Sequence, residues 1–140
     1  MNLYLDTSVL VALLAPDPLS DRASTFLGTA QDSLVVSDLA AAEFSSAIAR
    51  LVRMGSMPED DARARFADFD MWVERVAGRV GVEPTDMRRA DLFLRRLDLT
   101  LLAPDAIHIA IAQRLNTTLA TFDRKMAVSA TLLGVKVAEI

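Results

Sequence analysis

The sequence contains no cysteine and a single histidine, His108, among its 140 residues. The absence of cysteine excludes a disulfide framework, a thiolate zinc site and a thiol nucleophile. One histidine alone also argues against a zinc site of the usual ligand types. A metal site in this chain would therefore have to be built mainly from oxygen ligands.

Positive charge is also scarce. The chain has 15 Lys and Arg against 19 Asp and Glu, which gives a net charge of -4 and a sequence pI of about 4.9. A globally basic surface, of the kind that many nucleic-acid-binding domains carry, is therefore absent. Because 13 of the 15 basic residues are arginine, a local basic face is still open.

Long uncharged runs are missing as well. No stretch approaches the roughly 20 apolar residues needed to cross a bilayer, and the N-terminus lacks the basic start of a secretory signal. We therefore expect a cytoplasmic protein. The 52% hydrophobic content excludes intrinsic disorder, and residues 1–140 have the size of one domain. A mean hydropathy of +0.29 predicts that some apolar surface meets a partner.

Short apolar segments alternate with amphipathic ones along the chain. The predicted strands are Leu3–Leu5, Leu34–Val36, Val80–Val82, Thr118–Thr121 and Val135–Val137. The predicted helices cover residues 8–14, 20–30, 39–54, 58–76, 85–97, 104–115 and 123–133. This order predicts a single α/β domain with a parallel sheet of four to five strands flanked by helices. In such sheets, ligands bind at the carboxyl ends of the strands.

Four carboxylates are expected near that edge. Asp6 follows the first strand directly, and Asp123 stands just past the strand at Thr118–Thr121. Glu43 lies in the helix that follows the second strand, and helices of this kind begin at the same edge. Asp105 opens an apolar helix that follows no predicted strand, so its place at this edge is the least constrained of the four.

The surroundings of these acids favour a cation site. Glu43 and Asp105 stand inside apolar runs, where an unpaired charge is costly. Two carboxylates about 4 Å apart repel by roughly 4 kcal/mol at an effective dielectric of 20. A cluster of four would therefore bind protons or a cation, and hard oxygen ligands suit Mg²⁺ or Mn²⁺. Such a metal lowers the pKa of water and neutralises charge on a phosphodiester.

Taken together, these motifs resemble those of PIN-domain nucleases, and among them VapC-type toxins of type II toxin–antitoxin (VapBC) systems. The motifs that carry the resemblance are Leu5-Asp6-Thr7-Ser8, Glu43 in the segment 37–43, Pro104-Asp105-Ala106 and Thr121-Phe122-Asp123. Each motif is weak alone, but the four in this order span nearly the whole chain.

The resemblance implies a PIN-like nuclease domain over residues 1–140 that acts as a metal-dependent endoribonuclease on structured RNA, such as tRNA or rRNA. The implied catalytic residues and ligands of Mg²⁺ or Mn²⁺ are Asp6, Glu43, Asp105 and Asp123. The implied supporting residues are Thr7, Ser8 and Thr121. The resemblance also implies a homodimer and a small VapB-type antitoxin. This partner would occupy an apolar groove and supply a basic side chain to the site.

Other residues have both a functional and a structural interpretation. Arg50, Arg53 and Arg124 lie near the acidic edge by sequence and are the candidates for contacts with RNA phosphates. His108 lies one turn after Asp105 and is either a buried structural residue or a residue that supports the site or contacts RNA.

Structural interpretations also exist for the acids and for the aromatic residues. Asp6 and Asp123 would cap the helices that follow them, and Glu43 would pair with Arg50. The aromatic residues Phe66, Phe69 and Trp72 are either core residues or part of the antitoxin groove.

Three rival functions are weighed against the nuclease. A receiver-like phosphoacceptor domain would have adjacent acids after the first strand, where this chain has Asp6-Thr7-Ser8. An aspartate-nucleophile phosphatase would have a second Asp where this chain has Ser8. A non-catalytic PIN-type binding module would keep the fold without the chemistry, and the presence of all four acids argues against it.

Overall fold

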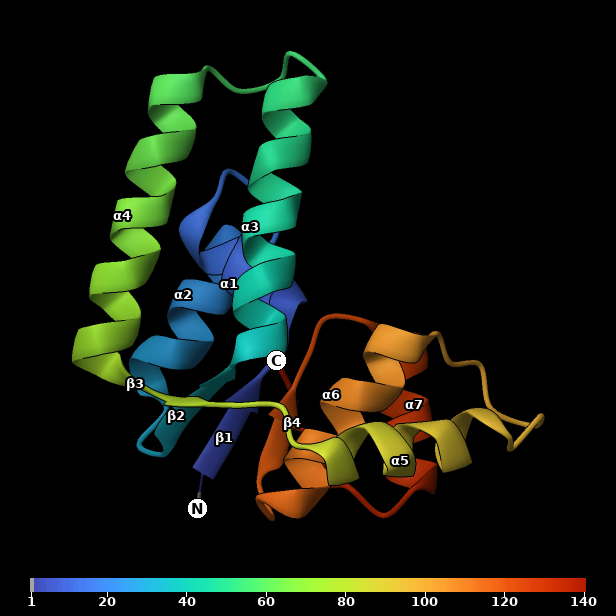
Figure 1. Cartoon of the computed structure of the whole chain (residues 1–140). Helices are drawn as coiled ribbons and strands as arrows, with labels where there is room; N and C mark the ends of the chain where they lie inside the picture. Colours follow the sequence, from blue (N-terminus) through green and yellow to red (C-terminus); the bar gives the residue numbers. More distant parts are fainter. Residues whose placement is uncertain (1) are drawn as a thin grey trace.

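The computed structural model describes residues 2–140. Within this range the chain forms four strands, which make one parallel sheet in the order β3-β2-β1-β4. The strands are β1 (Asn2–Leu5), β2 (Ser33–Ser37), β3 (Ala77–Val80) and β4 (Thr118–Ala120). Helices flank this sheet (Figure 1), so the predicted α/β class with a parallel sheet is confirmed.

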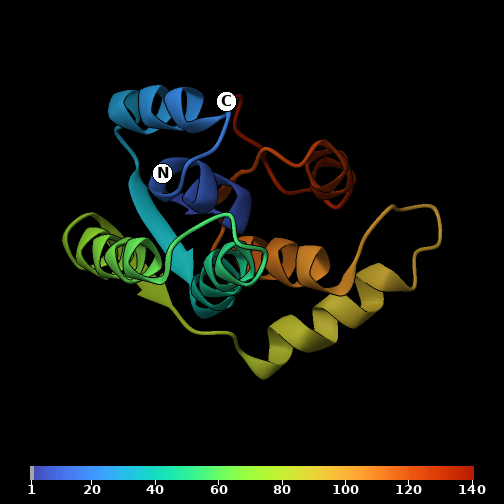
Figure 2. The ribbon, with the colours of Figure 1, turned by 90° about the horizontal axis from the view of Figure 1, so that it is seen from above.

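Seven helices join and cover the strands in the described range. They are α1 (Thr7–Leu14), α2 (Ser20–Thr29), α3 (Asp38–Arg53), α4 (Glu59–Val76), α5 (Pro84–Leu94), α6 (Ala103–Arg114) and α7 (Arg124–Leu132). Figures 1 and 2 both show α3 and α4 side by side, seen end-on in Figure 2, and α5 beside α6. None of the helices in residues 2–140 combines the length and hydropathy that a membrane crossing requires.

The core against the sheet has two parts because side chains alternate across β1, and a third, smaller cluster lies between α5 and α6. Leu3 and Leu5 belong to a cluster on one face of the sheet that includes residues of α1, α3 and α4. Tyr4 belongs to a second cluster with residues of α6 and α7. Helices α1, α3 and α4 therefore cover one face of the sheet, and α6 and α7 cover the other.

The prediction for the third strand was wrong in position. The strand is Ala77–Val80 and not Val80–Val82, and α4 leads into it without a loop. It is an edge strand that pairs only with β2 in the described sheet, and both Gly78 and Arg79 are exposed. An edge strand needs no apolar residue on both faces, so this segment lacked the signal that marks the central strands.

The predicted last strand, Val135–Val137, is reduced to a single parallel bridge between Leu119 and Val137. The sheet therefore has four strands, the lower end of the predicted range. Helix α5 also ends earlier than predicted, at Leu94 and not at residue 97.

The register of the sheet fixes the start of the candidate site. Leu5 of β1 pairs with Ala120 of β4, and the Asp6 amide continues the ladder to the Ala120 carbonyl over 3.2 Å. Asp6 and Thr121 therefore leave adjacent strands at the same carboxyl edge.

Candidate functional site

Asp6 is the most enclosed acid at this edge, with 2% of its surface exposed. Its Oδ1 accepts hydrogen bonds from the Ser8 hydroxyl at 2.6 Å and from the Val9 amide at 3.2 Å. Its Oδ2 accepts from the Thr121 hydroxyl at 2.5 Å. Burial raises the pKa of Asp6, although the bonds from Ser8 and Thr121 oppose this shift. Asp6 is thus held as an acceptor in a place where a charge is costly.

The two hydroxyls on Asp6 also hold the loop after β4. Ser8 Oγ accepts from the Phe122 amide at 2.9 Å, and Thr121 Oγ1 accepts from the Asp123 amide at 2.9 Å. Each hydroxyl therefore donates to the carboxylate and accepts from the backbone. This arrangement ties the position of Asp123 to that of Asp6.

Glu43 lies in the second turn of α3, with 32% of its side chain exposed. Its Oε1 accepts from the Thr7 hydroxyl at 2.8 Å and lies 2.5 Å from His108 Nε2. Burial raises the pKa of Glu43, but the contact with His108, together with the Thr7 hydrogen bond, outweighs burial and lowers it. Glu43 therefore pairs with His108, and not with Arg50 as its structural interpretation proposed.

His108 is buried, with 2% exposure, and it contacts the site as well. Its Nδ1 lies 2.6 Å from Tyr4 Oη, and the pKa of Tyr4 is raised mainly by burial. The burial of His108 agrees with its structural interpretation, and a supporting role in the site stays a prediction. Tyr4 was not a candidate in the sequence, where it reads as one residue of a buried strand.

Asp105 and Asp123 complete the acidic edge. Asp105 lies in the first turn of α6 and accepts from the Leu102 amide at 3.2 Å. Burial raises the pKa of Asp105 first, and the charges of Asp123 and Glu43 raise it further. Asp123 is exposed and caps α7, accepting from the Met126 amide at 3.0 Å. The structure thus brings Asp105 within electrostatic reach of two other candidate acids.

In the part of the chain that the structure describes, no three carboxylate or imidazole side chains are arranged to hold a metal ion as they stand. Asp6 is engaged by Ser8 and Thr121, and Glu43 by Thr7 and His108. The four candidate acids therefore lie at the carboxyl edge of the sheet, and two of them, Asp6 and Glu43, are already hydrogen-bonded to hydroxyl or imidazole groups.

Two hollows flank the acids. One, of about 600 Å³, lies between α1 and α3; Thr7 and Glu43 line one part of it, and Arg50 and Arg53 line another. The second, of about 290 Å³, is lined by Thr121, Asp123 and Arg124 among others. All three candidate arginines therefore line hollows that include a candidate acid.

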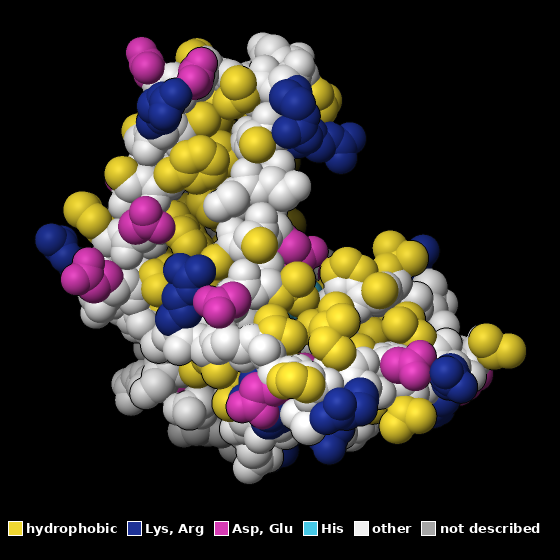
Figure 3. All heavy atoms as spheres, viewed as in Figure 1, with side chains coloured by type: hydrophobic (Ala, Val, Ile, Leu, Met, Phe, Trp, Pro, Cys, Tyr) yellow, Lys and Arg dark blue, Asp and Glu magenta, His cyan; other side chains and the backbone are white. Residues whose placement is uncertain are grey.

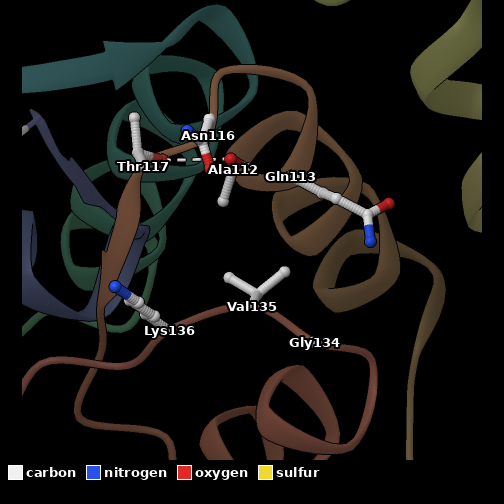
Figure 4. A pocket seen from close by; sticks show the side chains of 7 residues that line it. All are labelled: Ala112, Gln113, Asn116, Thr117, Gly134, Val135 and Lys136. Carbon is white, nitrogen blue, oxygen red and sulfur yellow. Dashed lines mark hydrogen bonds between the residues drawn. The ribbon is translucent and has the colours of Figure 1, made fainter.

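A third pocket lies away from the acids. It has a volume of about 190 Å³ and lies between the end of α6 and the segment 134–136 (Figure 4). Thr117 lines it and precedes β4, whereas Asp123 follows β4. The pocket is therefore at the amino edge of the sheet, opposite the candidate site.

The aromatic residues of α4 divide between core and surface. Phe69 is 3% exposed and stacks on Phe44 with ring centroids 4.7 Å apart. Phe66 and Phe69 line a hollow of about 370 Å³ between α3 and α4, where Figure 3 shows hydrophobic side chains at the surface. Trp72 is half-buried against the same core and does not line that hollow. Phe69 is therefore a core residue whose edge also reaches the groove.

Comparisons with known proteins identify the family of this chain. The family model for the PIN domain matches residues 3–131. The chain is 32% identical to Ribonuclease VapC46 of Mycobacterium tuberculosis over 138 residues, which cover 96% of this chain and 95% of that protein.

Two solved structures show the same fold. The structure of VapC20 of M. tuberculosis, a toxin described as cleaving the sarcin–ricin loop, is similar with a TM-score of 0.75 and 17% identity over 99% of both chains. VapBC2 of Rickettsia felis, bound to a promoter DNA fragment, is similar with a TM-score of 0.70 and 15% identity over 99% of this chain and 98% of that one. From the family model and the relative of similar length, the chain belongs to the PIN domain family and, within it, to the VapC ribonucleases.

Proposed function

We propose that this protein is a divalent-metal-dependent endoribonuclease toxin that hydrolyses phosphodiester bonds in structured RNA, such as tRNA or rRNA. The observation that carries the proposal is the acidic edge, where burial and the charges of Asp123 and Glu43 raise the pKa of Asp105. Carboxylates that raise the pKa of a neighbouring acid in this way favour a bound cation. The ribonuclease names of its relatives support RNA as the substrate.

The donor set fits Mg²⁺ or Mn²⁺, because all four acids offer hard oxygen ligands. Asp6, Glu43, Asp105 and Asp123 would hold the ion, directly or through water. When bound, the ion supplies a Lewis acid that neutralises phosphodiester charge and lowers the pKa of water. The chain's own residues hold these acids in place: Ser8 and Thr121 orient Asp6, and Thr7 and His108 orient Glu43.

The metal proposal predicts a thermal shift. Mg²⁺ or Mn²⁺ at about 100 times its dissociation constant should raise the wild-type Tm by roughly 5–10 °C. Asp105→Asn should lose most of this shift. Because the raised pKa of Asp105 means that its charge opposes folding, this variant should be at least as stable as wild type at pH 7 in EDTA. Differential scanning fluorimetry measures both effects.

The sign of this effect also predicts a pH dependence. When the pKa of a carboxyl group is higher in the folded than in the unfolded protein, its contribution to stability is full below the unfolded pKa. That contribution is lost as the pH rises through the folded pKa. The stability of Asp105→Asn relative to wild type should therefore grow between pH 4 and 7. The matched control is Asp91→Asn, at an exposed position. If Mg²⁺ or Mn²⁺ raised the Tm of Asp105→Asn as much as that of wild type, the proposed metal site would be contradicted.

Arg50 and Arg53 are proposed to contact RNA phosphates beside the acidic edge. Binding of an RNA hairpin to cleavage-deficient protein should weaken in Arg50→Gln and Arg53→Gln. The slope of log K against log salt should fall in magnitude by roughly 0.7–0.9 for each phosphate that the variant no longer neutralises. Fluorescence anisotropy measures the slope, and Arg88→Gln, at an exposed position of α5, controls for net charge. A slope equal to wild type in both variants would place the RNA elsewhere.

We also propose two protein partners, an antitoxin and a second copy of this chain. Solved VapBC structures among the neighbours support a VapB-type antitoxin that inhibits this enzyme. The hollow between α3 and α4, where Phe66 and Phe69 lie beside Asp38, Asp70 and Arg79, is the surface we assign to it. A homodimer is supported by exposed leucines at and beyond α5, since Leu92 is 65% and Leu97 93% exposed. Contiguous patches of exposed apolar side chains mark interaction sites, and Figure 3 shows hydrophobic side chains gathered over α5 and α6.

A further inference from the structure

A chain of buried polar side chains runs from the sheet to the candidate site. Ser37 Oγ lies 2.7 Å from Tyr4 Oη, and Tyr4 Oη lies 2.6 Å from His108 Nδ1. His108 Nε2 lies 2.5 Å from Glu43 Oε1. Ser37, Tyr4 and His108 are at most 2% exposed. Because buried polar groups must find their partners inside the protein, the position of each proton in this chain can be worked out.

The direction of the hydrogen bonds follows from the two ends. At one end, an ionised Glu43 carboxylate only accepts, so His108 Nε2 must carry a hydrogen. At the other end, Ser37 Oγ accepts from the Ala40 amide at 3.1 Å. Among the described hydrogen bonds, the only acceptor for the Ser37 hydroxyl hydrogen is Tyr4 Oη. Tyr4 therefore accepts from Ser37 and donates its own hydrogen to His108 Nδ1.

We infer that Tyr4 and His108 are positioning residues for Glu43: Tyr4 holds His108 as the neutral Nε2–H tautomer, and His108 in that form holds Glu43 Oε1. The opposite tautomer would place a nitrogen lone pair against the carboxylate. Thr7 donates to Oε1 as well, so both donors engage the same oxygen and leave Oε2 to serve a cation or water. The inference rests on the proposed function only in taking Glu43 as a residue of the site.

The tautomer can be observed directly, because His108 is the only histidine in the chain. Protein labelled with ¹⁵N-histidine gives one imidazole, and two-bond ¹H–¹⁵N correlations distinguish both neutral tautomers and the imidazolium. In metal-free wild type at pH 7.5 we expect the neutral Nε2–H form. Tyr4→Phe keeps the ring but loses the hydroxyl, so a mixture of forms should appear. A wild-type Nδ1–H or imidazolium form, or an unchanged tautomer in Tyr4→Phe, would overturn the inference.

Two substitutions at His108 test its action on Glu43. His108→Gln can place an amide N–H where Nε2 stands, whereas the shorter His108→Asn can replace only Nδ1. We expect RNA cleavage to fall about 10–100-fold in His108→Asn, as for other residues that orient metal ligands, and to recover in part in His108→Gln. If His108→Asn and His108→Gln had the same Tm and lost RNA cleavage to the same extent, a positioning role of His108 would be contradicted.

A double substitution separates positioning from stability. In the His108→Gln background there is no tautomer to select, so Tyr4→Phe should cause no further loss of cleavage. A structural role of Tyr4 would instead give losses that add. If wild type cleaves no RNA under any condition, the proposed function fails, and the imidazole spectrum of Tyr4→Phe still decides the inference about His108.

Discussion

Asp6→Asn is expected to reduce RNA cleavage by about 1,000-fold or more, since losing one charged group of the reaction centre is worth roughly 4 kcal/mol. The fold should survive. Asn is as good an N-cap as Asp, and its remaining oxygen can still accept from Ser8 and from the Val9 amide. Only the Thr121 hydroxyl loses its carboxylate acceptor. Gel assays on tRNA and rRNA with Mg²⁺, Mn²⁺ and EDTA, alongside circular dichroism, measure both properties.

The control for this experiment is Asp21→Asn, which removes the same charge from an exposed position in the first turn of α2. It should cleave RNA as wild type does. Full activity of Asp6→Asn would remove Asp6 from the site. Folded wild-type protein, free of antitoxin, that cleaves none of these RNAs with either metal would favour a non-catalytic PIN-type module.

The structural and functional interpretations of the acids turn out to be compatible. Asp6 and Asp123 both cap helices, as their ordinary interpretation predicts. A helix that follows a parallel strand begins at the carboxyl edge of the sheet, so a cap residue there is also at the place where ligands bind. The capping hydrogen bonds hold each carboxylate in a fixed position relative to the backbone, as a metal site built from acids requires.

Three of the four strands and the acidic edge could be predicted because their signals are local. Short apolar runs mark β1, β2 and β4, and an acid directly after such a run has its position fixed by the sheet. The position of the edge strand β3 could not be predicted in this way, because Gly78 and Arg79 are exposed and give no apolar pattern.

The contacts of His108 depend on the folded chain. Tyr4 is 104 residues away in the sequence and Glu43 is 65 residues away. Periodicity gives only the buried face of α6, so it predicts that His108 is enclosed but not which groups enclose it. The same holds for Asp86, which sequence analysis places only at the start of a helix.

Asp86 forms the most enclosed ion pair of the described residues, with Arg114 of α6. Asp86 is 1% exposed, and its two oxygens accept from Arg114 Nε at 2.8 Å and from Nη2 at 2.9 Å. The Glu83 amide also donates to it at 2.8 Å. Burial raises the pKa of Asp86, but the bonds from Arg114 and Glu83 outweigh burial and lower it. The pair therefore fastens the start of α5 to α6.

Arg114→Ala is expected to lower the free energy of unfolding by about 3–5 kcal/mol, because it leaves a buried carboxylate without its cation. Urea unfolding followed by circular dichroism measures the change. Arg63→Ala is the matched control. Its pair with Glu59 is exposed on both sides, at 70% and 69%, and should be worth less than about 1 kcal/mol. Similar small losses in both variants would show that the buried pair contributes no more than a surface one.

Two further observations separate the unpaired charge from lost packing. Asp86→Asn in the Arg114→Ala background should recover part of the stability, since a neutral amide can still accept from the Glu83 amide. The gap between wild type and Arg114→Ala should also narrow at low pH. A lowered folded pKa gives stability that is present above the unfolded pKa, near 3.9, and is lost as pH falls through the folded pKa. A gap that stays constant between pH 7 and 3 would assign the loss to the packing of the Arg114 side chain and not to the charge of Asp86.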